Sequence, residues 1–108
     1  MDKGEAIIDK RGAINVARQY AQAVRTHYGS GRVFLFGSYA KGNYHEDSDI
    51  DLAVIFGDYE NGFDRETELM HLRHEIDIRI EPHAFRESEF TPQDPLAYEV
   101  LKYGREIT

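Results

Sequence analysis

Two aspartates, Asp49 and Asp51, stand two residues apart where a polar loop meets an apolar run. On a β-strand, side chains at this spacing point to the same face, so both carboxylates could bind the same divalent cations. Gly37 and Ser38 follow an earlier apolar run. This Gly-Ser turn can offer a backbone N–H and a hydroxyl to a phosphate, because glycine lets the backbone come close. The stretch 36–51 therefore predicts a metal-assisted nucleotide site.

The elements that must position these residues alternate between helix and strand. Residues 1–11 are predicted to form a short helix or a loosely attached start. Apolar residues recur at three- and four-residue steps over 13–28, which predicts a helix that a glycine ends. Residues 33–36 are apolar and bounded by glycines, as in a central strand. A short helical turn is expected over 38–42, and a second strand over 49–56.

A third strand is predicted over residues 74–81, where isoleucines alternate with polar residues. Strict alternation indicates one covered face and one open face. Pro82 is expected to end the strand, because proline interrupts a sheet ladder. Asp77 falls on the predicted open face, which would bring it to Asp49 and Asp51 if the second and third strands are neighbours.

Two further helices are predicted. A loop and a helix are expected over 58–73, and Asp94 with Pro95 is typical of the start of a final helix, which Gly104 ends. The order of elements predicts an α+β fold of two layers, with helices on one face of a small mixed three-stranded sheet. A chain of this length supports one modest core, so residues 1–108 are expected to form a single domain.

Charge and composition limit the function. The formal net charge of −7 argues against stable binding of long nucleic acid, which takes clusters of Lys and Arg. A nucleotide that arrives with its own Mg²⁺ remains compatible. No apolar run is long enough to cross a bilayer, the start lacks the pattern of a signal peptide, and cysteine is absent. We therefore expect a cytoplasmic protein without a disulfide framework or a thiolate metal site.

Three aspartates beside a Gly-Ser turn suit two-metal phosphoryl transfer. Two Mg²⁺ ions about 3.5–4 Å apart can stabilise the attacking and leaving oxygens of an in-line displacement. Asp49 and Asp51 are expected to bridge both ions. Asp77 is expected to bind the ion that activates the attacking hydroxyl, and to accept its proton. Gly37 and Ser38 are expected to hold the leaving phosphates.

Simpler explanations exist for each of these residues. Aspartates at a loop–strand junction are often turn caps or surface charges. Ser38 could be the N-cap of the short helical turn, and it can cap and bind phosphate at once. Glu75 and Glu81 share the predicted facing of Asp77, and no role is assigned to them. Lys41 follows the turn and is expected to add positive charge beside the phosphates.

One motif in the chain resembles a family signature. Gly37-Ser38, ten intervening residues and Asp49-x-Asp51 resemble the signature of the DNA polymerase beta-like nucleotidyltransferase superfamily. The flanking residues look like its minimal nucleotidyltransferase (MNT) branch, and Asp77 matches the position of the third family carboxylate. The resemblance covers most of the chain, and it implies the nucleotidyltransferase fold and a nucleotidyltransferase activity.

The resemblance also implies a biological role. MNT proteins are often paired with a small helical HEPN-family toxin, and they act as the antitoxin by AMPylation. The chain would then transfer AMP from ATP to a hydroxyl of that partner, a tyrosine in the studied pairs, with two Mg²⁺ ions and in a hetero-oligomer. Two alternatives stay open: an antitoxin that neutralises its partner by binding alone, and nucleotidyl transfer to a small molecule.

Overall fold

The structure, a computed structural model, describes residues 9–108. The helix or loose start expected over residues 1–11 therefore lies mostly outside the described residues. In chain order the elements are α1 (Lys10–Tyr28), β1 (Arg32–Phe36), α2 (Ser38–Lys41), β2 (Ile50–Phe56), α3 (Gly62–Leu72), η2 (Arg73–Glu75), β3 (Ile80–Arg86), η3 (Glu87–Glu89), α4 (Pro95–Tyr103) and β4 (Arg105–Ile107). None of the helices within these residues is long and apolar enough to span a membrane.

The strands form one mixed sheet in the order β3-β2-β1-β4. β1 pairs antiparallel with β2 and β4, whereas β2 pairs parallel with β3. The predicted α+β fold with a mixed sheet is confirmed, but the sheet has a fourth strand that the sequence does not predict. In register, Phe36 lies opposite Asp51, and Asp51 lies opposite Glu81. Three neighbouring strands thus meet at the end of the sheet where the Gly-Ser turn begins.

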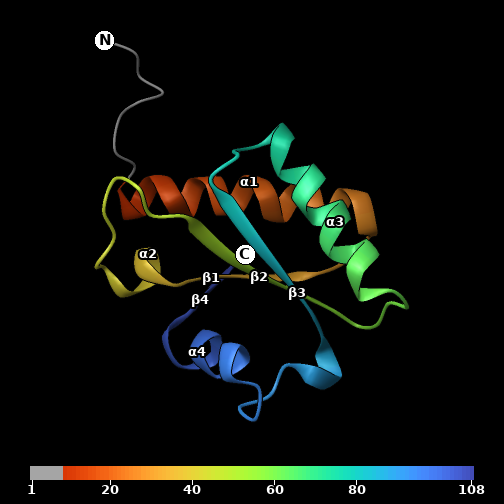
Figure 1. Cartoon of the computed structure of the whole chain (residues 1–108). Helices are drawn as coiled ribbons and strands as arrows, with labels where there is room; N and C mark the ends of the chain where they lie inside the picture. The colour runs from red at the N-terminus through yellow and green to blue at the C-terminus, as the bar shows by residue number, and fades with distance from the viewer. Residues whose placement is uncertain (1–8) are drawn as a thin grey trace.

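α1 covers one face of the sheet (Figure 1). The Asp9 side chain accepts a hydrogen bond from the Gly12 N–H and begins the helix, and Gly29 ends it in the left-handed conformation. The apolar positions of the predicted helical face are buried against β1 and β2. Tyr20 donates its hydroxyl to the Leu69 carbonyl at 2.8 Å, which joins α1 to α3. The predicted helix and its apolar face are confirmed.

α4 covers the opposite face, so the prediction that helices lie on one face only is wrong. Figure 1 shows α1 above the sheet and α4 below it. A second apolar cluster fills the space under α4, and its members are Phe34, Phe36, Ala53, Ile55, Phe85, Ala97 and Val100. The physical reason lies in β1 and β2, which are apolar on both faces and need cover on both. The α4 helix begins at Asp94, whose side chain accepts from two backbone N–H groups, as predicted.

β3 begins later than predicted, which corrects the expected strand over 74–81. Residues 73–79 form a 3₁₀ turn and a tight turn instead, and Ile78 is 67% exposed. Local hydrogen bonds favour the turn, because the Asp77 carboxylate accepts from the Arg79 N–H at 2.9 Å. Pro82 lies inside β3 rather than after it. The proline is tolerated because β3 is an edge strand.

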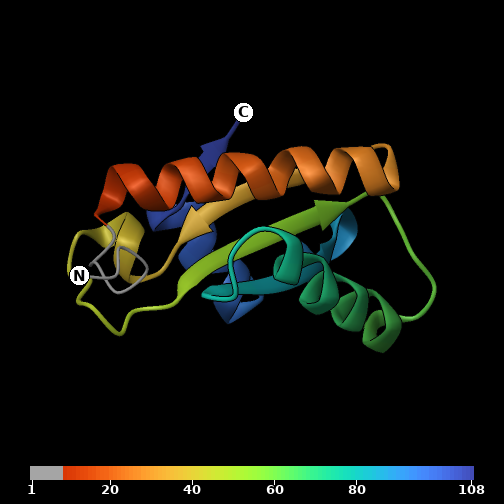
Figure 2. The same cartoon turned by 90° about the horizontal axis from the view of Figure 1, so that it is seen from above.

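α3 lies beside the free edge of β3 (Figure 2). The Glu66 carboxylate of α3 accepts from the Ala84 N–H at 2.7 Å. Arg73 donates Nη1 to the Ile80 carbonyl at 2.9 Å. Two backbone groups of the edge strand are therefore satisfied by side chains from the α3–η2 segment.

Candidate active site

Gly37 brings the chain directly against Asp51. It ends β1 with φ 73° and ψ −153°, a conformation that glycine adopts far more easily than other residues. A Cβ atom on Gly37 would collide with Oδ2 of Asp51 on the neighbouring strand. The expected proximity of the Gly-Ser turn and the second aspartate is therefore present, and it depends on the absence of a side chain at residue 37.

The two aspartates occupy different positions at the start of β2. The side chain of Asp51 lies on the strand and is 26% exposed, whereas Asp49 is exposed in the preceding loop. Ser48 holds this loop, because its buried hydroxyl accepts from the His45 N–H at 2.8 Å. A second bond, from the Ser48 N–H to the His45 carbonyl at 2.9 Å, closes the turn. The loop thus presents Asp49 beside an accessible Asp51.

β3 places two polar residues on the face of the sheet that carries Asp51. Glu81 lies opposite Asp51, and His83 lies opposite Ala53, in the parallel register of β2 and β3. His83 Nε2 is 3.8 Å from Asp51 Oδ1, and its ring meets Phe36 edge-on with centroids 5.4 Å apart. Pairing with Asp51 raises the pKa of His83 above its usual range, against the opposite effect of burial.

The sequence predicts Glu81 on the same open face as Asp77 but assigns no role to it. His83 falls beyond the predicted end of the third strand at Pro82, so it has no assigned role either. The signal that could have found them is the apolar character of Ala84 and Phe85, which extends the strand past the proline. Because β3 begins several residues later than predicted, Glu81 and not Asp77 lies opposite Asp51.

Asp77 does not lie on a strand face. It precedes β3 in the turn, and its side chain is only 14% exposed. The carboxylate accepts from Arg79 Nε at 2.9 Å and from Arg79 Nη2 at 2.7 Å. This guanidinium lowers the pKa of the Asp77 carboxyl below its usual range. Within the described residues, the polar partner of Asp77 is therefore Arg79, and the expected open position on a strand is wrong.

Ser38 and Lys41 stand at the two ends of α2. Gly37 occupies the N-cap position, so Ser38 is the first helical residue and not the cap. Lys41 Nζ is 3.0 Å from Glu99 Oε2 and lies 4.9 Å from the ring centroid of Tyr103. Lys41 thus joins α2 to α4, while its expected role beside the phosphates stays a prediction.

The carboxylates fit a magnesium ion that is shared with a substrate. Among residues 9–108, no three His, Asp or Glu side chains are close enough to hold a metal by themselves. Mg²⁺ is usually held by one or two carboxylates together with substrate phosphates and water. Asp51, next to the Gly37 backbone, and Asp49 in the preceding loop could provide such an incomplete set of ligands.

The sequence matches the model of a known protein family. A family model described as a nucleotidyltransferase domain matches residues 17–104. The chain belongs to the nucleotidyltransferase domain family. The matched residues include the Gly-Ser turn, both aspartates and the whole of β3. Comparison with curated proteins gave no match.

Solved structures share the fold. A protein from Sulfolobus solfataricus, described as a nucleotidyltransferase, is 22% identical with a TM-score of 0.66, and the match covers 90% of this chain and 80% of that chain. A mutant of the toxin–antitoxin pair MntA-HpeT is 24% identical with a TM-score of 0.64, over 83% and 70% of the two chains. A toxin–antitoxin structure with AMP-PNP is 26% identical with a TM-score of 0.65, over 88% and 72%. Family and fold together identify the chain as a nucleotidyltransferase.

Proposed function

We propose that this nucleotidyltransferase transfers AMP from ATP to a hydroxyl of a partner protein and thereby acts as the cytoplasmic antitoxin of a toxin–antitoxin pair. The partner would be a small helical HEPN-family toxin and the acceptor a tyrosine. The contact between the Gly37 backbone and the Asp51 carboxylate carries the proposal, because it joins a phosphate-binding turn to a metal-binding group. The similarity to a toxin–antitoxin structure with AMP-PNP, an analogue of ATP, supports ATP as the nucleotide and a toxin as the partner.

The reaction is an in-line displacement. The acceptor oxygen forms a bond to the α-phosphorus of ATP, the bond from that phosphorus to the β-phosphate oxygen breaks, and pyrophosphate leaves. Gly37 and Ser38 would bind the leaving phosphates, and Lys41 would add positive charge if it leaves Glu99. Asp49 and Asp51 would hold Mg²⁺, which neutralises the charge that develops on the attacking and leaving oxygens.

The attacking hydroxyl gives up a proton, and we propose a carboxylate of the site as its acceptor. Asp77 is the residue that the family resemblance indicates, but it is paired with Arg79, and a low pKa makes a poor proton acceptor. Glu81 lies opposite Asp51 in the β2–β3 register and is partly exposed. We therefore propose Glu81 as the third carboxylate of the site, with Asp77 in a supporting role in the turn before β3.

Label transfer from α-labelled ATP tests the activity. We expect the double substitution Asp49→Asn plus Asp51→Asn to abolish labelling of the partner and to leave the circular dichroism spectrum unchanged, because both side chains keep their size. The matched control is Asp47→Asn plus Asp64→Asn, which removes the same charge from exposed positions. Labelling by the first variant at the wild-type rate would contradict the proposal.

Neutralisation by binding alone is the second candidate. Large apolar side chains on the outer face of α4 support it, because Tyr98 and Leu101 are each 47% exposed. The two functions differ in their need for ATP. Full neutralisation of the toxin by the Asp49→Asn plus Asp51→Asn variant without ATP would favour binding over chemistry.

A further inference from the structure

The two carboxylate oxygens of Asp51 face different neighbours. Oδ2 faces the backbone of Gly37, where a Cβ atom would collide with it. Oδ1 lies 3.8 Å from Nε2 of His83 on β3. One oxygen is thus directed to the Gly-Ser turn and the other to an imidazole, so the carboxylate has a neighbour on each side.

The imidazole of His83 is held in place by two neighbouring strands. In the parallel register of β2 and β3, His83 lies opposite Ala53, whose small side chain is fully buried. The ring meets Phe36 of β1 edge-on with centroids 5.4 Å apart, and Phe36 in turn lies opposite Asp51. The sheet itself therefore fixes the position of the ring beside the carboxylate.

We propose that His83 is a positioning residue, which donates a hydrogen bond from Nε2 to Oδ1 of Asp51 and so keeps Oδ2 available for Mg²⁺ on the side of the Gly-Ser turn. The inference rests on the proposed function, because it assigns a partner to one of the proposed magnesium ligands. The separation of 3.8 Å exceeds the hydrogen-bond range of about 3.2 Å, and hydrogen bonds at active sites are often long before the substrate binds. Imidazole donates from Nε2 in one neutral tautomer and in the protonated form, so the role needs no change of charge.

Two other roles for His83 have less support. Direct binding of Mg²⁺ is disfavoured, because this ion prefers oxygen ligands. Packing alone would need only the contact between the ring and Phe36, and would give no reason for Nε2 to face Asp51. Residues that hydrogen-bond to metal ligands orient them, and losing such a partner typically costs about 10- to 100-fold in metal affinity or activity. The positioning role therefore predicts a measurable effect that packing alone does not.

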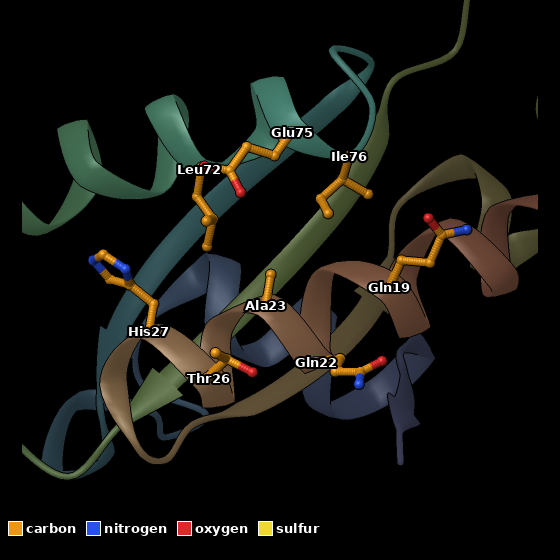
Figure 3. A pocket seen from close by; sticks show the side chains of 8 residues that line it. All are labelled: Gln19, Gln22, Ala23, Thr26, His27, Leu72, Glu75 and Ile76. Atoms are coloured by element: carbon orange, nitrogen blue, oxygen red, sulfur yellow. The ribbon is translucent and has the colours of Figure 1, made fainter.

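A histidine on α1 provides a matched control. His27 lines a groove of about 610 Å³ between α1 and the α3–η2 segment (Figure 3). Like His83, it meets an aromatic ring edge-on, that of Tyr28 with centroids 4.7 Å apart. None of the residues that line the groove belongs to the Gly-Ser turn, to β2 or to β3. The same substitution at His27 therefore changes a similar aromatic pair away from the candidate active site.

Binding of AMP-PNP to the full chain, with and without Mg²⁺, tests the proposal. His83→Phe keeps an aromatic ring and removes the donor, whereas His83→Gln restores an N–H group near the position of Nε2. With Mg²⁺ present, we expect calorimetric titration to show about tenfold weaker binding of AMP-PNP to His83→Phe than to the wild type. His83→Gln and His27→Phe should stay within about threefold of the wild type. In EDTA, all four proteins should bind AMP-PNP with the same affinity, because the proposed role acts only through the metal ligand.

Three results would overturn the positioning role. They are wild-type affinity of His83→Phe with Mg²⁺, an equal loss in His83→Gln, and a loss in EDTA, which would mean direct contact with the nucleotide. His83→Ala is a second variant without the donor and should show the same loss, and circular dichroism should show wild-type helix content in each variant. The assay needs no partner protein. A wild type that does not bind AMP-PNP with Mg²⁺ would overturn the proposed function as well, whereas wild-type binding with an unaffected His83→Phe overturns this inference alone.

Discussion

At the scale of single residues, the site depends on one close approach between strands. Gly37 and Gly42 both have positive φ, but only Gly37 has a side chain in the space where a Cβ would lie. At Gly42 nothing lies within 4 Å of that position. The two glycines flank the same short helix but differ in ψ, which is −153° at Gly37 and 5° at Gly42. An alanine at Gly37 would therefore add more backbone strain as well as a steric conflict.

Gly37→Ala should therefore cost more than Gly42→Ala. We expect a loss of about 1 kcal/mol in the free energy of unfolding for Gly42→Ala, from the left-handed backbone alone. For Gly37→Ala we expect about 2–3 kcal/mol, because its backbone lies in a region almost confined to glycine and the new methyl group must also displace the Asp51 carboxylate. Urea unfolding measures both values. Equal losses in the two variants would show that the close approach to Asp51 does not affect the free energy of unfolding.

The third carboxylate can be assigned by a pair of isosteric substitutions. We expect Glu81→Gln to lower the rate of AMP transfer by about 100-fold or more, because it removes the proposed proton acceptor. Asp77→Asn should instead lower stability, because it weakens a charged pair with Arg79 that is largely buried on the aspartate side. Steady-state rates and urea unfolding separate the two effects. A large loss of rate with Asp77→Asn alone would return the role to Asp77.

At the scale of elements, the strands around the Gly-Ser turn are predictable and β3 is not. β1 and β2 are nearly continuous apolar runs that each end at a glycine, and this pattern is typical of a buried strand. The alternation of isoleucines before Pro82 has the strand period, yet hydrogen bonds between Asp77 and Arg79 turn that segment back on itself. β4 is too short to leave a pattern. The residues of the site on β1 and β2 could therefore be predicted. The register that places Glu81 and not Asp77 opposite Asp51 could not.

The attachment of α3 to β3 can be tested at the same scale. We expect Glu66→Ala to lower the free energy of unfolding by about 1–2 kcal/mol, because the Ala84 N–H loses its acceptor. Glu60→Ala, in an exposed loop, is the control and should stay within about 0.5 kcal/mol. Hydrogen exchange at Ala84 should quicken in the first variant only. Unchanged exchange there would mean that the edge strand does not need α3.

At the scale of the whole molecule, two helices on opposite faces hold one sheet. The sequence predicts the helices, the mixed sheet and the order of elements, but it does not show which face each helix covers. Residues such as Phe34 and Ala53 are apolar on the α4 face, and a strand that is apolar on both faces gives no direction to its neighbours. The face of the sheet next to Asp51 is covered because α4 packs on it. Tertiary contacts decide this packing, and the local sequence pattern does not show it.

The bond between Tyr20 and the Leu69 carbonyl links two segments of this assembly that are far apart in the chain. We expect Tyr20→Phe to lower the free energy of unfolding by about 1 kcal/mol, because the Leu69 carbonyl loses one of its two donors and keeps only the Arg73 N–H. Tyr98→Phe removes an exposed hydroxyl and should change stability by less than about 0.5 kcal/mol. Thermal unfolding compares the two. A smaller shift in the unfolding temperature for Tyr20→Phe than for Tyr98→Phe would show that this hydrogen bond does not stabilise the fold.

The two edges of the sheet differ in how they resist aggregation. Unpaired edge groups are templates for strand addition from other molecules, which leads to insoluble assemblies. On β3, Glu66 and Arg73 already occupy the Ala84 N–H and the Ile80 carbonyl, so an incoming strand would have to displace them. On β4, the shortness of the strand and the exposed charges of Arg105 and Glu106 give the protection. Solubility at high concentration should therefore be lost first when the charges of β4 are removed.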